Sequence, residues 1–362
     1  MRRLTTALTA VGGALLALGA GVPDAPAARP DRGTREVSWT AGDAARYWTP
    51  ERMASARAWE PPPTAPNPAR PAPDAGTPAP VPQHGGETDA DGAEARGPDE
   101  VTSEGGWTVP AGAVRGGAAP EHRPGTGRDF DGTPTVGRMY LARGDGSYFC
   151  TASVVDSPAG DLVLTAAHCL VGNEARRMAF VPRSTKATPR PYGMFPVRVD
   201  GAGRSVVYAD DRYRARGPER GALWDVAFVR VGAGADGRTV RATVGANRLV
   251  TSGAWEFPKV RLIGHPASTA RPRVCENRTT KFTSTDPGSP GSFLRIDCTG
   301  FPGGTSGGPF LVDWDERRGS GDVVGLIGGW KTGGPTADTS YSPPFGADVR
   351  RLYERAGGTP KG

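Results

Sequence analysis

Two short stretches of the chain carry residues that could act together in nucleophilic hydrolysis. His168 stands near the end of the apolar run LVLTAAHCL, and Ser306 lies in the glycine-rich stretch GGTSGGPF. A serine hydroxyl is a weak nucleophile until a neighbouring base takes its proton, and histidine suits that role because its ordinary pKa lies near neutrality. The pair therefore predicts a hydrolase whose fold brings His168 to Ser306.

A site of this kind needs two further components. An acidic residue must hold the imidazole in the right tautomer and stabilise it once it is protonated. Backbone N–H groups must stabilise the developing oxyanion, and the glycines around Ser306 leave room for the substrate to reach such donors. Several aspartates lie between His168 and Ser306, so residue types alone leave the choice of the acid open.

The sequence around these residues resembles the trypsin-like serine proteases, which have the chymotrypsin fold. TAAHC (165–169) and GTSGGP (304–309) resemble the His and Ser motifs of that family, and WDVAFVRV (224–231) resembles its Asp motif. The order of the three motifs is also the order in the family. The likeness covers about residues 130–356 and is closest to the secreted bacterial trypsin-like peptidases.

The resemblance implies a role for each residue of the site. Ser306 would be the nucleophile, His168 the base and Asp225 the orienting acid, because Asp225 alone among the intervening aspartates opens an alternating strand of the family's form. Gly304 and Ser306 would donate the oxyanion N–H groups. Most members have an Asp before the nucleophile that pairs with a freed N-terminus, whereas this chain has Thr305. We therefore expect an oxyanion loop that is formed without that salt bridge.

The substrate pocket departs from that of trypsin. Gly300 stands where trypsin has its pocket Asp, so no carboxylate would meet a Lys or Arg side chain. After the Ser motif, Ile327, Gly328, Gly329 and Trp330 resemble the strand that lines the pocket. Ile327 replaces the His of the glutamyl endopeptidases, and Trp330 is expected to narrow the pocket mouth. We expect a preference for a small or medium apolar side chain. His265, in LIGHPA, is interpreted as structural.

The elements that must position the site are predicted to be mostly strands. Short apolar runs separated by Gly, Pro, Asp and Asn follow residue 130, which indicates an all-β barrel or sandwich. The resemblance implies two packed antiparallel β-barrels. Only Ala347–Ala356 has a clear helical pattern, and Gly357 follows it as a stop signal. The strands are expected at 135–142, 149–155, 162–166, 178–181, 197–199, 205–208, 226–231, 260–263, 293–296, 309–312 and 323–327.

The regions outside the barrels differ in composition. Residues 1–27 combine a basic start, an apolar stretch and small residues, which is typical of a secretory signal peptide; a membrane anchor is the alternative. Residues 61–128 are rich in Pro, Gly and Ala and predict a largely disordered linker or pro-region. Residues 129–357 are then the protease domain, exported to the extracellular space.

Residues 28–60 contain aromatic side chains that indicate docking onto another surface. Thr49, Pro50 and the following Glu predict the start of a short helix that runs to about Trp59. Segments like YWTPERM precede the protease domain in the secreted bacterial relatives, which favours a pro-segment and hence a zymogen. A partly ordered tail without a role is the alternative.

The cysteines predict two disulfides. All four lie in the protease domain, and export would place them in an oxidising compartment, so three pairings are possible. The resemblance implies Cys150 with Cys169 and Cys275 with Cys298. Neither CxxC nor clustered His–Cys spacing is present, which argues against zinc. No metal or cofactor is predicted.

Composition also limits the partners. The formal net charge is +6 over 362 residues, and the Arg residues alternate with acidic ones, so no nucleic-acid partner is expected. No later apolar run is long enough to span a bilayer, so no stable membrane association is expected. The prediction is a secreted, monomeric serine endopeptidase acting on proteins or peptides through an acyl-enzyme.

Two alternatives to this function are compatible with parts of the sequence. The same barrels could serve as a catalytically silent or latent binding module, although the presence of all three triad residue types weighs against it. An esterase of another fold would also use GxSxG, which residues 304–308 match by letter. In that fold Ser precedes His and a helix follows Ser, and neither holds here.

Overall fold

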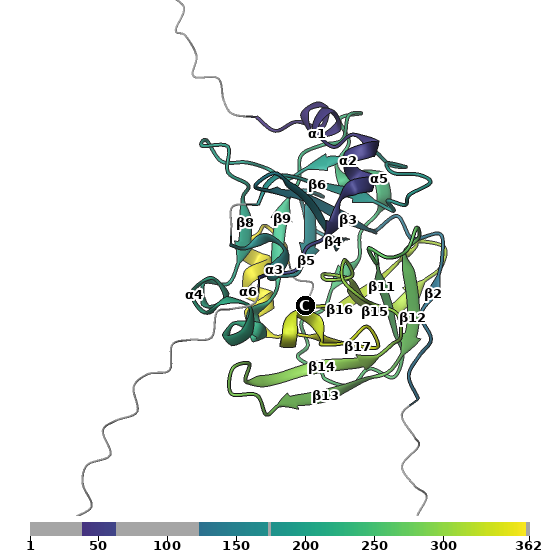
Figure 1. Cartoon of the computed structure of the whole chain (residues 1–362), viewed down its shortest axis with the longest axis vertical. Coiled ribbons are helices and arrows are strands. Elements are labelled where there is room, and N and C mark those ends of the chain that lie inside the picture. Colours follow the sequence, from purple (N-terminus) through teal and green to yellow (C-terminus); the bar gives the residue numbers. More distant parts are fainter. Residues whose placement is uncertain (1–37, 63–122, 173–174, 360–362) are drawn as a thin grey trace, which may run out of the picture. The chain divides into compact units, whose positions relative to one another are not determined.

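The computed structural model describes residues 38–62, 123–172 and 175–359. The predicted signal peptide, the start of the predicted pro-segment and most of the predicted linker lie outside these residues. The described chain forms three sheets and a few short helices, as Figure 1 shows. No helix in these ranges is both long enough and apolar enough to cross a membrane.

The first sheet has the strand order β7-β6-β3-β4-β5-β9-β8, with β1 on β4 outside this path. All its pairs are antiparallel except that of β1 with β4. Its strands are β1 (Arg57–Ala58), β3 (Val136–Arg143), β4 (Gly146–Val155), β5 (Leu162–Thr165), β6 (Arg176–Pro182), β7 (Phe195–Pro196), β8 (Val207–Ala209) and β9 (Ala227–Arg230).

Two further sheets follow in the second half of the chain. One has the order β10-β16-β15-β11-β12-β2 and the other β13-β14-β17. Their strands are β2 (Arg128–Asp129), β10 (Arg248–Leu249), β11 (Val260–Gly264), β12 (Arg273–Asn277), β13 (Thr279–Ser284), β14 (Gly291–Asp297), β15 (Pro309–Asp315), β16 (Ser320–Leu326) and β17 (Thr339–Ser342). This mostly antiparallel arrangement confirms the predicted all-β class.

The helices are short and lie between or beside the sheets (Figure 1). They are α1 (Ala41–Tyr47), α2 (Pro50–Ser55), α3 (Ala167–Leu170), α4 (Asp211–Arg220), α5 (Val240–Val244) and α6 (Ala347–Arg355), with single 3-10 turns η1 (Ala222–Trp224) and η2 (Trp330–Gly333). The predicted C-terminal helix is confirmed as α6, whose buried face carries Val349, Leu352 and Tyr353.

Two helix predictions need correction. The helix that begins at Pro50 with Thr49 as its cap ends at Ser55, because Arg57 and Ala58 pair with β4 as strand β1. The expectation that only Ala347–Ala356 is helical is also wrong. It overlooked α4, whose sequence DRYRARGPER lacks an apolar stripe and bends at Gly217, where φ is +73°.

A large apolar core is formed by side chains of the first sheet and extends to side chains from the second half of the chain. It joins Val154, Leu164 and Phe228 with Leu326 and the buried face of α6. A smaller core around Leu262, Ile296 and the second disulfide fills the rest of the second half. Apolar side chains therefore pack the two halves against each other, and the burial of these side chains stabilises the packing.

Residues 38–62 are an ordered part of this assembly. Trp48 is fully buried, and Met53 is nearly so, in a cluster with Tyr140 and Phe149 of the first sheet. The Trp48 indole N–H donates to the carbonyl of Arg177 at 2.7 Å. The expected disorder of the region before the protease domain therefore does not extend to this segment.

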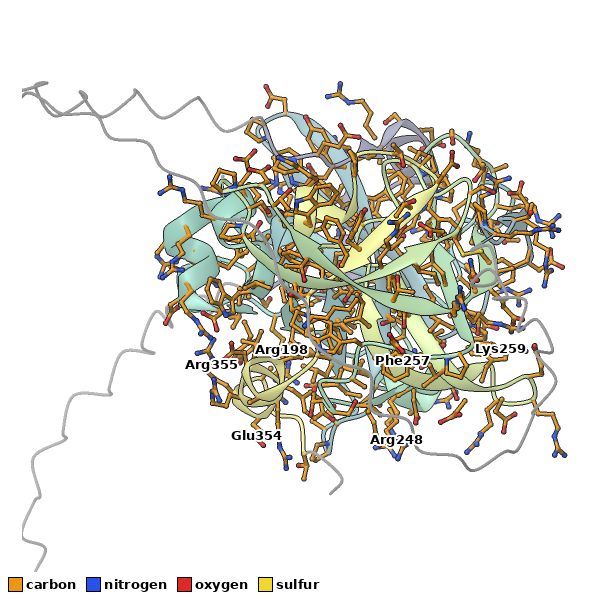
Figure 2. The ribbon with its side chains drawn as sticks, turned by 90° about the horizontal axis from the view of Figure 1, so that it is seen from below. Arg198, Arg248, Phe257, Lys259, Glu354 and Arg355 are labelled. Atoms are coloured by element: carbon orange, nitrogen blue, oxygen red, sulfur yellow. A yellow bond between two sulfur atoms is a disulfide. The ribbon has the colours of Figure 1, made fainter. Side chains whose placement is uncertain are left out.

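Charged side chains cover the outside of the described chain. Figure 2 labels Arg248, Lys259 and Glu354 at its edge, and all three are exposed. Arg248 pairs with Asp322, Lys259 with Glu276, and Glu354 with Arg350. These positive charges thus stand next to acidic partners, as the alternation in the sequence predicts.

Candidate active site

His168 lies in α3, directly after β5. The residue is only 2% exposed, and its Nδ1 lies 2.7 Å from Oδ2 of Asp225. The backbone N–H of His168 also donates to Oδ1 of Asp225 at 2.7 Å. Two contacts to one carboxylate fix both the position of the α3 turn and the orientation of the imidazole ring. This leaves Nε2 as the nitrogen that can exchange a proton with a substrate.

Asp225 is fully buried where η1 meets β9. Besides its two contacts to His168, its Oδ2 accepts a hydrogen bond from the Gly329 N–H at 2.8 Å. A Cβ on the neighbouring Gly328 would come within 3.0 Å of the same oxygen. Gly328 and Gly329, expected as pocket-lining residues, are thus placed against Asp225, where the lack of a side chain permits their close approach.

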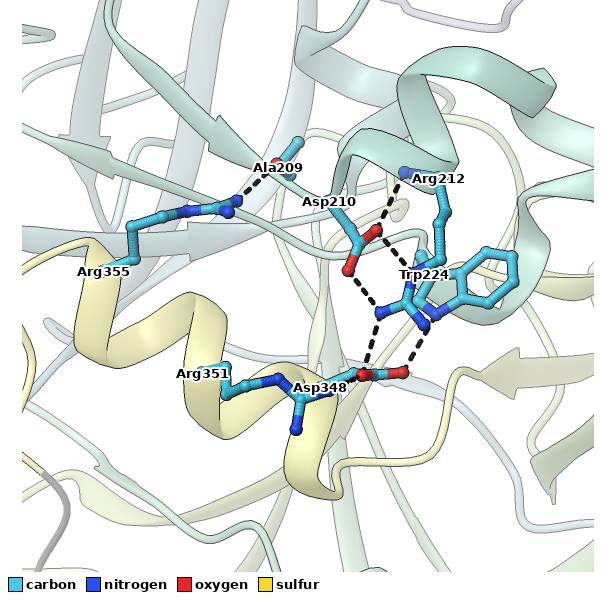
Figure 3. A network of polar contacts seen from close by, with 7 residues as sticks. All are labelled: Ala209, Asp210, Arg212, Trp224, Asp348, Arg351 and Arg355. Atoms are coloured by element: carbon cyan, nitrogen blue, oxygen red, sulfur yellow. Dashed lines mark hydrogen bonds and ion pairs between the residues drawn. The ribbon is translucent and has the colours of Figure 1, made fainter.

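The turn that carries Asp225 is held from outside by a polar network that Figure 3 shows. The Trp224 indole donates to Oδ2 of Asp348 at 3.0 Å, and Oδ1 of Asp348 pairs with Arg212 at 2.8 Å. Arg212 also binds Asp210, and Arg355 donates to the Ala209 carbonyl. Partial burial acts to raise the pKa of Asp348, but hydrogen bonds from Arg212 and Trp224 hold it below its ordinary value.

The same network links α4, η1 and α6, and it includes Trp224, the residue directly before Asp225. Arg212 lies on α4, Trp224 ends η1, and Asp348 lies in the first turn of α6. The C-terminal helix therefore contributes to positioning Asp225, although it is remote from it in the sequence. No sequence motif indicates this link.

Ser306 lies in the turn between β14 and β15 and is fixed against the edge of β4. Its carbonyl accepts a hydrogen bond from the Thr151 N–H at 2.9 Å, and the Thr151 hydroxyl donates to the Gly304 carbonyl at 2.9 Å. Gly307 has φ of +82°, and a Cβ there would lie 2.2 Å from the Thr151 carbonyl oxygen. The glycine after the serine is therefore required by close packing on β4.

The loop before Ser306 is held by Thr305. Its hydroxyl donates to the Pro302 carbonyl at 2.7 Å, and its N–H reaches the same oxygen at 3.2 Å. The N–H groups of Gly304 and Ser306 have no acceptor among the described residues. Two free N–H groups beside a serine are what an oxyanion hole requires.

His168 and Ser306 are not hydrogen-bonded to each other in this structure. His168 Nε2 is buried and has no hydrogen-bond partner within the described ranges, while Ser306 is partly exposed. A hydrogen bond between His168 Nε2 and the Ser306 hydroxyl would therefore have to form before the two residues could act together. His265 lies nearby, and burial, followed by the positive charge of Arg138, lowers its pKa well below the ordinary value.

A cavity of about 400 Å³ opens beside Ser306. Of the residues expected in the pocket, Ile327 lines it. Trp330 instead packs on Phe282 and Tyr341, with ring centroids 4.7 Å away from each. Gly300 is absent from the lining, and its carbonyl accepts a hydrogen bond from Arg273.

Sequence reasoning missed two parts of the cavity wall. One is the stretch from Thr332 to Ala337, which begins within η2 and contains the turn sequence Gly-Gly-Pro as a signal that could have been used. The other is Glu60 with Pro61, from the far N-terminal segment. Nothing in the sequence near these two residues indicates a position beside Ser306.

Both disulfides are formed. Cys150 is joined to Cys169 with a Cα–Cα distance of 6.3 Å, and Cys275 to Cys298 with 6.0 Å. These are the pairings that the resemblance implies. The first bridge ties β4 to the residue after His168, so it restrains the turn that carries the imidazole.

Comparison with known proteins agrees with this geometry. The family model described as "Trypsin-like peptidase domain" matches residues 150–326. The structure of the protease Anisep from Arthrobacter nicotinovorans is similar, with 21% identity and a TM-score of 0.53, covering 64% of this chain and 99% of that chain. The thermostable serine protease AL20 from an extremophilic microorganism gives 22% identity and a TM-score of 0.51, covering 62% and 97%. No curated protein sequence matches the chain.

Residues 150–326 therefore form a trypsin-like peptidase domain, and the protein that carries it is a serine endopeptidase. At this level of identity the two solved structures establish the shared chymotrypsin-like fold.

Proposed function

We propose that this protein is a secreted serine endopeptidase that cleaves proteins or peptides with a triad of Ser306, His168 and Asp225. The observation that carries the proposal is the buried 2.7 Å contact between His168 Nδ1 and Asp225 Oδ2. It leaves the opposite ring nitrogen available for Ser306, as the order of proton transfers requires.

The proposed reaction follows from these positions. His168 Nε2 takes the proton of the Ser306 hydroxyl as the oxygen attacks the scissile carbonyl, and the N–H groups of Gly304 and Ser306 stabilise the oxyanion. The same imidazolium then protonates the leaving amine, which leaves an acyl-enzyme on Ser306. Water, deprotonated by His168, hydrolyses that ester. Asp225 keeps the ring oriented throughout.

The oxyanion loop is proposed to form without a freed N-terminus. Thr305 holds the loop through its own hydroxyl, and the Val136 N–H, where such an N-terminus would be produced, is already bonded to the Thr133 carbonyl at 3.2 Å within a buried strand. An oxyanion hole that appeared only after trimming near Val136 would contradict this.

The cavity beside Ser306 supports a preference for small or medium apolar side chains. Phe301 and Ile327 line it, and the lining residues from the predicted protease domain include no carboxylate that could meet a basic side chain. Cleavage of a peptide library at equal rates after Arg and after Leu would contradict this preference.

The organisation of the whole chain is proposed to serve export and latency. Residues 1–27 would be a signal peptide, 28–60 a pro-segment, 61–128 a linker or removable pro-region, and 129–357 the protease domain, active as a monomer outside the cell. The oxidised cysteines fit an extracellular protein.

A second candidate is a latent or silent binding module of the same fold. It is favoured by one observation, the buried Nε2 of His168, which has no hydrogen-bond partner among the residues that the structure describes. Labelling with a fluorophosphonate, followed by peptide mass spectrometry, separates the two. Label on Ser306, absent in Ser306→Ala, supports the peptidase, and that variant is expected to lose about 10⁶ in kcat. A folded, disulfide-intact protein without label would support the silent module.

A further inference from the structure

The end of the N-terminal segment lies on the same strand edge as the nucleophile. On one side β4 pairs with β3 from Gly146 to Ser153. On the other side β5 pairs only with Ser153–Val155, and the Ser306 carbonyl binds the Thr151 N–H. Strand β1 pairs with two further residues of β4, Arg57 with Tyr148 and Ala58 with Phe149. The segment thus lies two residues along β4 from the contact of Ser306.

Trp59 fastens this segment to the turn of the proposed base. Its backbone N–H donates to the Phe149 carbonyl at 3.1 Å, and its indole N–H donates to the His168 carbonyl at 2.9 Å. The ring meets Tyr148 edge-on at 5.1 Å, and Arg143 covers it at 4.0 Å. Burial lowers the pKa of Arg143 to about 10, so it stays charged at neutral pH and favours this contact.

The next two residues enter the cavity beside Ser306. Glu60 and Pro61 form part of its wall, and Glu60 is the one charged residue among the described residues that line it. Glu60 also touches the oxyanion loop, because a Cβ on Gly303 would lie 2.6 Å from its Oε1 and 3.2 Å from the Cβ of Ala58. A substrate that approached Ser306 along this side would meet these atoms.

The state of His168 agrees with an occupied cleft. A general base must reach the leaving group of the substrate, yet Nε2 is buried and has no partner in the described part of the chain. We propose that residues 57–62 are an autoinhibitory segment that occupies the substrate cleft beside Ser306, and that Trp59 is its anchor. This inference rests on the proposed peptidase function of the same site.

Residues 57–62 are kept in place by the preceding residues 38–56, which pack on the first sheet, and not only by the chain that follows residue 62. Trp48 and Met53 are buried in the first sheet, and the indoles of Trp39 and Trp48 donate to carbonyls on β6. Cleavage of the chain after residue 62 would remove none of these contacts. Activation therefore requires that Trp59 leave the His168 turn, or that the chain be cut before Trp59.

The test compares the full chain with its Trp59→Ala and Trp39→Ala variants. Trp39 is a matched control, because its indole makes the same kind of bond, 2.9 Å to the Met178 carbonyl, away from the cavity. Two rates are measured, the digestion of fluorescently labelled casein and the labelling of Ser306 by a small fluorophosphonate. We expect Trp59→Ala to raise both rates about tenfold or more by shifting the segment out of the cleft, with no rise for Trp39→Ala.

A second variant keeps the test valid if Trp59→Ala does not fold. Glu60→Ala removes an exposed side chain from the cavity without touching His168, and it is expected to lower the KM for casein. The proposed autoinhibition would be overturned if Trp59→Ala digested casein and reacted with the fluorophosphonate no faster than the parent, and Glu60→Ala had the KM of the parent. Labelling of Ser306 in the parent protein would in that case still support the proposed peptidase function. If no protein is labelled at Ser306, the proposed function fails, and the inhibition fails with it.

Discussion

A single carboxylate organises the candidate site at the scale of residues. Asp225 accepts hydrogen bonds from the backbone of His168 and from Gly329, and it faces the imidazole Nδ1. It thereby joins α3 of the first half to the chain that follows β16 in the second. A substitution that keeps the shape of the Asp225 side chain but changes its hydrogen bonding should show how far Asp225 acts by orienting the His168 ring and how far by filling its place in the packed interior.

Asp225→Asn is expected to lower kcat by about 10⁴, because an amide N–H facing Nδ1 favours the wrong tautomer of His168. The exposed Asp236 provides a control, since Asp236→Asn should leave kcat unchanged. The measurement is steady-state hydrolysis of a peptide substrate by variants whose unfolding in urea matches that of the parent. Full activity in Asp225→Asn would mean that another group orients the base.

His265 should make the stability of the protein depend on pH. Burial lowers its pKa in the folded state, whereas the unfolded chain binds a proton below about pH 6.5. The unfolded state then binds more protons, so the free energy of unfolding falls as the pH drops below that value. His265→Phe should flatten this decline between pH 7.5 and pH 5 in urea titrations. If the free energy of unfolding of His265→Phe fell with pH as steeply as that of the parent, the pH dependence would belong to other titratable groups.

At the scale of elements, the two disulfides offer a matched pair. They span 19 and 23 residues, so loop entropy predicts a similar stabilisation of about 3 kcal/mol from each. Only the bridge of Cys150 with Cys169 adjoins the His168 turn.

Replacing Cys150 and Cys169 by Ala should therefore lower kcat/KM more than replacing Cys275 and Cys298, at similar loss of stability. Both double variants would be compared at a temperature where urea titrations show them folded. Equal losses of kcat/KM would mean that the bridge does not position the imidazole.

Elements with a strong local signal were predictable from the sequence, and those defined by distant contacts were not. Leu162–Thr165 and the α6 helix follow from apolar periodicity. Strand β13, with the sequence TTKFTS, alternates weakly and is fixed by pairing with β14. Likewise, motif letters indicate His168 and Ser306, whereas the position of Glu60 beside them depends on tertiary packing.

At the scale of the whole molecule, the N-terminal segment behaves as part of the fold. Trp48 is fully buried among Tyr140, Phe149 and Met194. Trp48→Ala is therefore expected to reduce the free energy of unfolding by about 3–5 kcal/mol, as for other large-to-small changes in a core. Urea titration of the full chain measures this. Trp39→Ala, at a partly exposed site, should cost less, and equal stability of Trp48→Ala and the parent would show a loosely held tail.

The division of the site between sheets has a consequence for synthesis. His168 follows β5 and Asp225 precedes β9 of the first sheet, whereas Ser306 lies on the turn into β15, so the three residues can meet only when the whole stretch from His168 to Ser306 has been made. Most of the chain must leave the ribosome before Ser306 does, and α6, which steadies the Asp225 turn, comes later still. A nascent chain therefore lacks the assembled candidate site, and residues 38–62, two of which share a cavity wall with Ser306, are made well before Ser306.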